Sequence, residues 1–369
     1  MSPKDTWTSE PGDASNYRVS PYDAAFPGTL PHLNRHCVEL GVRTAIALNA
    51  NVQYRSAFDR KHYFYSDLPS GYQITQHYAP FALGGIVNLP HAGKEVRLHQ
   101  IQLEQDTGKS TFDIRRRLSS IDLNRAGTGL MEIVSEPDMR SPEEAGDDGN
   151  MEQGSLRCDV NVSVHKPGQP FGTRCEIKNL NSVRFMMTAI TSEVFRHIDL
   201  LDSGLSVPQE TRGFDEQKAE TFALRSKEDA PDYRYMPDPN LPPLLIDESY
   251  ISRIRDKMPA LPSATRSRLQ GMGLSARDAE VLMTVDVGRE MGYDGELGQG
   301  AVAFFDQLAQ GRDAKTAVNW LTHELLGQLA LRHESFKDNV MSVTQLGELI
   351  DLVQSKKITV RSKPGVLRP

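Results

Sequence analysis

Three absences in this 369-residue sequence narrow the classes of protein that it fits. No apolar run is long enough to span a bilayer and the mean hydropathy is −0.47, which excludes a transmembrane segment. The N-terminus has no apolar signal region, and it contains Asp5, Glu10 and Asp13, whereas transit peptides are rich in arginine and poor in acids. The N-terminal sequence therefore does not indicate a cellular compartment. An excess of positive charge is also missing, because the formal net charge is −7. Any contact with RNA must therefore come from a local basic patch.

Cysteine is scarce as well. Cys37, Cys158 and Cys175 are far apart in the sequence and have neither the spacing of a zinc site nor the number expected of a disulfide framework. We interpret them as small buried hydrophobic residues of a protein in a reducing compartment.

The composition changes along the chain and predicts an α+β fold. Residues 1–30 are rich in Pro, Ser, Gly and Asp and are expected to be irregular. Residues 31–257 carry mostly strand patterns, with helical patterns at 33–48 and 183–201 that would cover the sheet. Residues 258–353 show helical patterns separated by glycine, which predicts a smaller all-α domain, and residues 354–369 form a basic tail.

A hairpin at 156–178 is the most regular pattern in the sequence. Apolar and polar residues alternate strictly over 156–164, the turn sequence KPGQP follows, and alternation resumes at Phe171. One face is apolar, and the other carries Arg157, Asp159, Glu176 and Lys178. This charged face could be a site with converging acids or an ordinary solvated sheet face.

Two further acids lie in strand patterns. Glu104 lies in the strand predicted over 96–106, and Glu132 lies between Met131 and Ile133 in the short apolar strand LMEIV. Since an unpaired buried carboxylate costs several kcal/mol, Glu132 should reach a sheet edge, a cation or a metal, or simply face solvent. Upstream, Lys61 precedes aromatic residues 63–65, which could stack a base or pack in the core.

Long motifs make a family resemblance recognisable. They include FDRKHYFYSDLPSGYQITQ, LEQDTGKS, LNRAGTGLMEIVSEPDMRSPEEA, GTRCEIKNLNS, DAPDYRYMPDPNLPPL and AVNWLTHELLG. Together they resemble the B subunit of the glutamyl-tRNA(Gln)/aspartyl-tRNA(Asn) amidotransferase from about Glu10 to Ala330. The resemblance implies a cradle-shaped kinase domain over 31–257 and a subunit that helps to convert Glu-tRNA(Gln) to Gln-tRNA(Gln) with ATP and Mg²⁺. The implied partners are an A subunit, which is the glutaminase, a small C subunit and the tRNA.

The same resemblance assigns roles to residues. Glu104, Glu132 and Asp159 match the metal-binding acids of the family, and Arg157 and Lys178 are candidates for contact with phosphate. Lys61, Tyr63 and Tyr65 are expected to line the nucleotide pocket. Glu104, Glu132, Asp159 and Lys178 together form the expected catalytic set.

The sequence also departs from the family pattern. Relative to the family, an initial strand whose Glu and His would join the metal site is absent, and Gln105 replaces a second Glu. The helix expected after 141–145 is deleted, which shortens the domain near 145–150, and the tail domain after 353 is missing or replaced. An internal gap with both flanks intact suggests a skipped coding segment in a eukaryotic nuclear gene, and hence a mitochondrial protein, with the bacterial cytoplasm as the alternative. The absence of the first strand favours a rival hypothesis, a non-catalytic scaffold that docks a partner subunit or tRNA, whereas the presence of Glu104, Glu132, Asp159 and Lys178 favours the enzyme.

Overall fold

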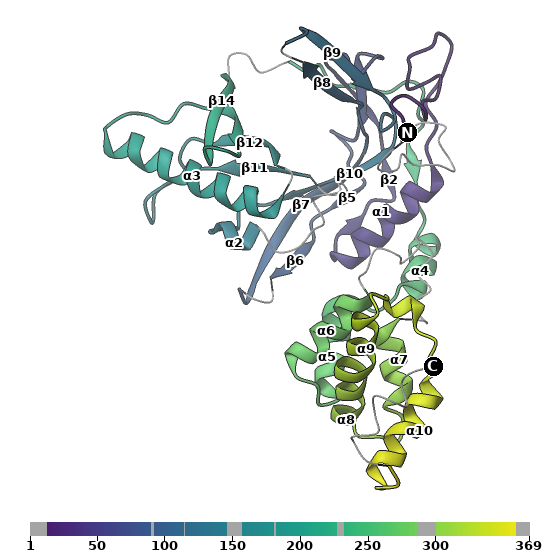
Figure 1. The fold of residues 1–369 in the computed structure, drawn as a ribbon. Helices are drawn as coiled ribbons and strands as arrows, with labels where there is room; N and C mark the ends of the chain where they lie inside the picture. The colour runs from purple at the N-terminus through teal and green to yellow at the C-terminus, as the bar shows by residue number, and fades with distance from the viewer. Residues whose placement is uncertain are drawn as a thin grey trace. The chain divides into compact units, whose positions relative to one another are not determined.

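The computed structural model describes residues 13–89, 92–113, 115–145, 157–180, 182–226, 232–286 and 300–358. The chain divides into two compact units, Met1–Asp256 and Lys257–Pro369 (Figure 1). The first unit combines helices with several sheets and the second is helical, which confirms the α+β fold. Within the described ranges, no helix has both the length and the apolar character needed to cross a membrane.

The main sheet of the first unit is organised around its longest strand, β7 (Lys94–Gln105). Antiparallel to β7 lie β5 (Ala82–Leu83), β6 (Ile86–Leu89) and β10 (Gly129–Ser135), and β1 (Asn51–Val52) extends the sheet beyond β5. Helix α1 (Arg35–Ala47), predicted at 33–48, packs on this sheet. Its Gly41 lies so close that an added Cβ would be 3.1 Å from the Phe81 ring, so a larger residue would require that ring to shift.

The described part of the first unit also contains three smaller sheets, whose strands lie between and after those of the main sheet in the sequence. Strands β15 (Met236–Pro237), β3 (Asp59–His62) and β4 (Tyr72–Thr75) form the first, β16 (Leu244–Leu245) and β2 (Arg55–Ser56) the second, and β8 (Lys109–Asp113) and β9 (Leu118–Asp122) the third. Strand β15 lies more than 170 positions after β3 in the sequence and pairs antiparallel with it. Helix α4 (Glu248–Lys257), which the sequence analysis did not predict, closes the unit.

The predicted hairpin exists, although its strands are shorter than the alternation suggested. Strands β11 (Cys158–Val162) and β12 (Cys175–Leu180) are antiparallel, and β13 (Glu210–Asp215) and β14 (Glu220–Ser226) complete a four-stranded sheet. Phe171 was expected on the apolar face, but it precedes β12 and is 57% exposed, with its ring against His165. The alternation of apolar and polar residues therefore covers more of the sequence than the paired strands do.

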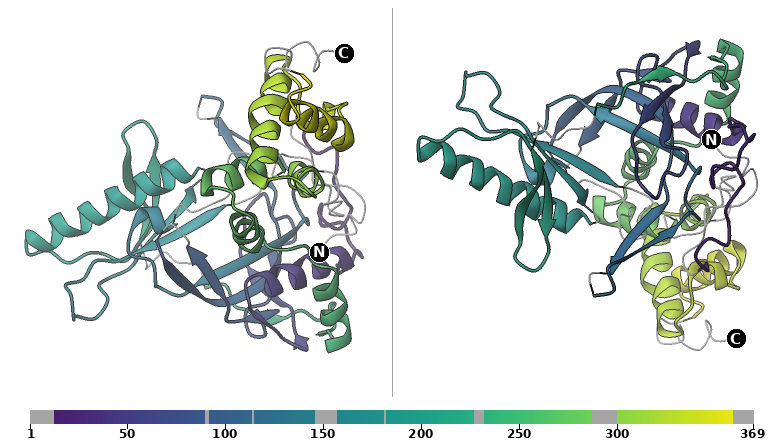
Figure 2. Two further views of the ribbon diagram at one scale, coloured as in Figure 1. Left: turned by 90° about the horizontal axis from the view of Figure 1, so that it is seen from below. Right: turned by 90° about the horizontal axis from the view of Figure 1, so that it is seen from above.

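Helix α3 (Val183–Asp202) covers the hairpin sheet, as predicted (Figures 1 and 2). The Ser182 hydroxyl accepts a hydrogen bond from the Phe185 amide and so caps the helix N-terminus. The helix buries Met186, Ala189 and Ile190 against Val162, Ile177 and Leu180 of the sheet. The helix start predicted at 141–145 forms the short helix α2 (Pro142–Ala145). The deletion inferred near 145–150 falls mostly on residues 146–150, which lie outside the described ranges.

The second unit is helical, as the patterns over 258–353 predicted. Its helices are α5 (Pro262–Gly271), α6 (Ala276–Asp286), α7 (Ala301–Leu308), α8 (Ala314–Asn319), the π-helix η2 (Trp320–Leu325), α9 (Leu326–Leu331), the 3₁₀ turn η3 (Phe336–Asp338) and α10 (Val343–Gln354). Their apolar faces enclose one core, in which Phe305, Leu321 and Ile350 are fully buried. Of the basic tail predicted at 354–369, residues from 359 onward lie outside the described ranges.

Candidate active site

Two of the predicted acids meet on neighbouring strands. In the antiparallel register of β7 and β10, Leu130 lies opposite Glu104 and Glu132 lies opposite Gln102. The Gln102 amide nitrogen donates a hydrogen bond to Glu104 Oε1 (2.9 Å) and another to Glu132 Oε2. The two carboxylates are therefore gathered around one side-chain amide, as diagonal neighbours on one face of a sheet can be.

Glu104 is the buried member of this pair, with 6% of its surface exposed. Strand β4 supplies two more donors, because Thr75 Oγ1 donates to Glu104 Oε1 and Gln73 Nε2 donates to Oε2 at 3.3 Å. Burial and then the charge of Glu132 raise the pKa of Glu104 to about 7, against the opposing effects of the Thr75 hydrogen bond and the Lys61 charge.

This arrangement fits a bound Mg²⁺. The acids present hard carboxylate oxygens from adjacent strands, which are the ligands that Mg²⁺ prefers. Burial first and the neighbouring Glu132 charge second raise the pKa of Glu104, and a divalent cation between the two carboxylates would offset both effects. Glu132 is exposed on β10, which is the terminal strand of its sheet, so the pair is open to solvent on that side.

The predicted pocket residues of β3 and the following loop lie beside the acids. Tyr63 Oη donates to the Gln73 side-chain oxygen (3.2 Å), and the amide of the same Gln73 reaches Glu104. The Lys61 ammonium lies 4.7 Å from the centre of the Tyr233 ring. Tyr65 is 61% exposed, with its ring edge-on to Tyr63 at 5.7 Å. A cation and several aromatic rings thus adjoin the acid pair.

The charged face of the hairpin forms a second group. Lys178 Nζ donates to Asp159 Oδ2 at 2.7 Å and lies 3.1 Å from Glu176 Oε1. Burial lowers the pKa of the Lys178 ammonium, but its hydrogen bond to Asp159 and the nearby acids outweigh burial, so that pKa lies above its ordinary value. Arg157 forms an ion pair with Asp106, the residue two positions after Glu104, with 2.9 Å between the guanidinium nitrogen and Oδ2.

The structure therefore assembles part of the predicted set. Glu104 and Glu132 share a donor, with Lys61 and Tyr63 nearby, whereas Asp159 and Lys178 pair with each other on another sheet. In the part of the chain that the structure describes, Asp159 does not form a three-ligand group with the two glutamates. The role of Asp159 as a metal ligand stays a prediction, as do the phosphate contacts of Arg157 and Lys178.

Sequence reasoning missed the polar residues that orient the acids. Gln102 alternates with Glu104 on β7, a period-two signal that points both side chains to one face. Gln73 and Thr75 alternate in the same way on β4. The sequence carried this signal, but the contact between β4 and β7 joins residues about 30 positions apart, which single-strand patterns do not reveal.

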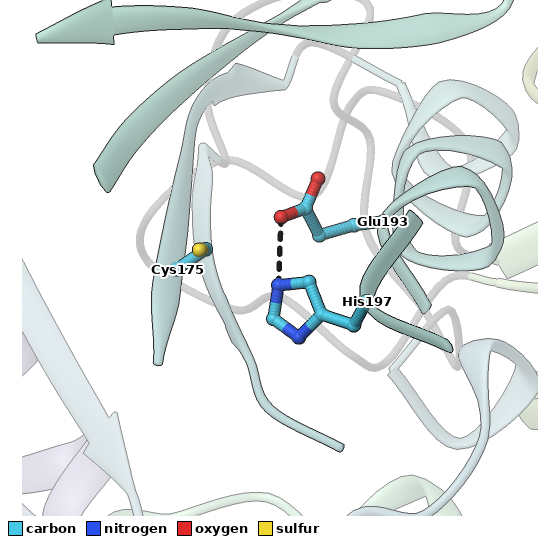
Figure 3. A group of neighbouring side chains, drawn as sticks. All are labelled: Cys175, Glu193 and His197. Carbon is cyan, nitrogen blue, oxygen red and sulfur yellow. Dashed lines mark hydrogen bonds and ion pairs between the residues drawn. The ribbon is translucent and has the colours of Figure 1, made fainter. Parts of the chain in front are cut away.

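One other cluster has ligand-type side chains. Among the residues whose structure is described, only Cys175, Glu193 and His197 bring three such groups within 4.8 Å of one another (Figure 3). Glu193 is already bonded by Arg196 (2.6 Å), Arg212 (3.1 Å), Thr221 (2.6 Å) and His197 (2.9 Å). Two guanidinium groups on one buried carboxylate repel a metal ion, so we interpret the cluster as a structural junction between α3 and its sheet.

Comparison with known proteins identifies the family. Residues 4–252 match the profile described as the GatB/GatE catalytic domain, and residues 303–368 match the GatB domain. The chain therefore belongs to the GatB/GatE family, as its motifs indicated.

Individual relatives agree with this assignment. The chain is 57% identical to a protein of Laccaria bicolor over 97% of this chain and 71% of that protein, and 46% identical to one of Mycosarcoma maydis over 95% and 64%. Both bear the name of the mitochondrial B subunit of glutamyl-tRNA(Gln) amidotransferase. A protein of Methylobacterium sp. (strain 4-46), named as the B subunit of aspartyl/glutamyl-tRNA(Asn/Gln) amidotransferase, is 45% identical over 94% and 72%. The chain thus spans about two thirds to three quarters of the length of these relatives.

Proposed function

We propose that this chain is the kinase-bearing subunit of a mitochondrial, ATP-dependent tRNA amidotransferase, which converts Glu-tRNA(Gln) to Gln-tRNA(Gln). The observation that carries the proposal is the pair of carboxylates of Glu104 and Glu132, held around one amide beside Lys61 and an aromatic cluster. Membership of the family and the mitochondrial names of its fungal relatives support the assignment and the location.

The chemistry explains why paired acids are needed. A carboxylate is a poor acceptor of ammonia, so the side-chain carboxylate of the tRNA-bound glutamate must first be phosphorylated by ATP. The resulting acyl phosphate has a good leaving group, and ammonia displaces it to give the amide. Phosphoryl transfer of this kind depends mainly on positioning the reactants and neutralising their charge.

The residues divide this work between them. Glu104 and Glu132 would hold Mg²⁺, which when bound neutralises phosphate charge and orients the ATP phosphates. Gln102, Gln73 and Thr75 fix the positions of the carboxylates through the hydrogen bonds described above. Lys61 would supply a positive charge near the acids, where it opposes the rise in the pKa of Glu104. Ammonia would come from an A subunit with glutaminase activity, assembled with a small C subunit.

Amidation by a reconstituted complex tests the proposal. The chain is assembled with A and C subunits and given Glu-tRNA(Gln), glutamine, ATP and Mg²⁺, and the amino acid released from the tRNA is identified. ATP-dependent formation of Gln-tRNA(Gln) supports the proposal. A complex that assembles and binds tRNA but forms no Gln-tRNA(Gln) supports the rival scaffold function and contradicts the kinase assignment.

A further inference from the structure

The two strands that carry the acid pair are connected by an exposed hairpin. Strand β7 ends at Gln105 and β10 begins at Gly129, and between them β8 and β9 pair from Lys109↔Asp122 to Asp113↔Leu118 (Figure 1). Every described residue of β8 is exposed. The base of the hairpin is fixed, because the Gly108 amide donates to the Asp67 carbonyl (2.9 Å) and Arg125 donates to the Gly108 carbonyl (3.1 Å). The hairpin is therefore an arm that extends from a firm attachment near Glu104.

The tip of this arm is strongly basic. Arg115, Arg116 and Arg117 follow one another and are all exposed, with 81% of the Arg116 side chain accessible. The Asp113 carboxylate accepts hydrogen bonds from the backbone amides of Arg115 (2.9 Å) and Arg116 (3.1 Å), while its nearest approach to the Arg116 guanidinium is 3.7 Å. Asp113 thus shapes the turn and leaves most of the positive charge facing solvent.

Exposed apolar residues flank this charge in the sequence. Phe112, one residue before Asp113, is 61% exposed, and Leu118 at the start of β9 is 54% exposed. Exposed apolar side chains beside three cations differ from an ordinary solvated turn, which is the simpler interpretation of a charge run. Arginine guanidinium groups bind phosphates bidentately, and an adjacent ring can stack an unpaired base. The combination fits RNA better than an acidic protein surface.

We propose that the Arg115–Arg117 tip binds the phosphate backbone of the tRNA whose aminoacylated end occupies the Glu104/Glu132 site. The inference rests on the proposed function. The four steps of β8 from Lys109 to Asp113 span roughly 14 Å, given a strand rise of about 3.4 Å per residue, and the tip lies beyond them. A tRNA anchored at the acid pair by its 3′ end has phosphates at that range. The chain has a formal net charge of −7, so a local basic arm is the kind of feature that a polyanion requires.

The salt dependence of tRNA binding tests this directly. The complex of the full chain with A and C subunits is titrated with tRNA(Gln) at several salt concentrations, as wild type and as the triple variant Arg115→Gln, Arg116→Gln, Arg117→Gln. We expect the negative slope of log affinity against log salt to become shallower by about 2, and the affinity to fall about tenfold or more in low salt, because phosphate contacts release counterions. A matched control replaces Arg253, Arg255 and Lys257, three exposed cations at the end of α4, by Gln. The control should leave the slope nearly unchanged.

A single variant separates binding from folding. Arg117 has φ = 50°, a left-handed conformation that glycine adopts more readily than arginine. Arg117→Gly should therefore leave the melting temperature unchanged or raise it, while weakening tRNA binding. A lower melting temperature together with unchanged tRNA binding would overturn the proposal, because Arg117 would then serve the fold alone.

The outcomes distinguish this inference from the function on which it rests. If the wild-type complex binds no tRNA, the proposed function fails and the inference fails with it. If the wild type binds tRNA and the triple variant binds it equally with the same salt slope, only the arm assignment is overturned. If the triple variant instead loses its A or C subunit while tRNA binding persists, the arm docks a protein, and the RNA assignment is wrong.

Discussion

Glu104 of β7 and Glu132 of β10 accept hydrogen bonds from the same side-chain amide, that of Gln102. One acid is buried and the other is exposed, so the pair has a protected side and an open side. Burial and the closeness of the two carboxylates disfavour ionisation of Glu104, whereas a cation bound between them would favour the ionised pair. The pair is the feature from which the proposed chemistry follows.

Magnesium should stabilise the wild-type fold and not a variant that lacks one acid. A ligand that binds only the folded state stabilises it by about 1.4 kcal/mol at roughly ten times its Kd. We expect the melting temperature of the wild type to rise by several degrees between EDTA and Mg²⁺, and that of Glu104→Gln to change little. Glu95→Gln, an exposed substitution on the same strand, should respond like the wild type. Equal Mg²⁺ responses of all three proteins would place the cation elsewhere.

Gln102 should set the geometry of the acids. Replacing it with Leu keeps a similar volume but removes the donor that both carboxylates share. We expect the Mg²⁺ concentration for half-maximal amidation to rise about tenfold, in the range seen when groups that orient metal ligands are removed. The maximal rate at saturating Mg²⁺ should fall less. If only the maximal rate changed, Gln102 would not be positioning metal ligands.

The Asp159–Lys178 pair offers a way to separate a structural role from a catalytic one. The pair is partly exposed, with 50% and 32% of the side chains accessible, so each single substitution should cost no more than about 1 kcal/mol of stability. We expect Asp159→Asn to abolish amidation nonetheless, because the family resemblance assigns this carboxylate to the metal. The swap Asp159→Lys with Lys178→Asp should regain much of the lost stability without regaining activity. Regained activity would show that the pair is structural.

The Glu193 junction should make the hairpin sheet sensitive to acid. Burial raises the pKa of this carboxyl, but hydrogen bonds from His197, Arg196 and Thr221 outweigh burial and hold the pKa well below its usual value of 4.5. A lowered pKa contributes stability that is present above the unfolded value and is lost as the pH falls below it.

A matched substitution tests this contribution. Glu193→Gln should destabilise the fold by about 3 kcal/mol or more at neutral pH, because it leaves Arg212 and Arg196 without their buried partner. The difference from the wild type should shrink below about pH 4.5, as measured by urea unfolding over pH. A difference that is independent of pH would show that the carboxylate charge is not the cause.

Local periodicity predicted much of this fold. Helix α3 has a clear apolar stripe and a serine cap, and it forms where the sequence indicated. The hairpin and the helical unit follow from the same kind of signal, because alternation and 3.6-residue spacing report which face is buried. Helix α4 was missed because it is short and mostly polar, with only Ile251 and Ile254 buried.

The candidate site was less predictable, because it depends on contacts between strands that are distant in sequence. Glu132 lies between two apolar residues, which suggested burial, but β10 is the terminal strand and Ile133 itself is 44% exposed. The hydrogen bonds from Gln73 and Thr75 to Glu104 join β4 to β7, and no local pattern specifies that pairing. The family motifs identified Glu104 and Glu132 as candidate ligands, and the structure identified the side chains that orient them.

ATP hydrolysis stimulated by Glu-tRNA(Gln) tests the central claim most directly. The chain is assembled with its A and C partners in Mg²⁺, and wild type, Glu132→Gln and the control Glu95→Gln are compared with and without the charged tRNA. We predict at least tenfold stimulation in the wild type and the control, and none in Glu132→Gln, a specific loss of about 1.4 kcal/mol or more in barrier lowering. Full stimulation in Glu132→Gln, or none in a wild-type complex that assembles and binds the tRNA, would contradict the account.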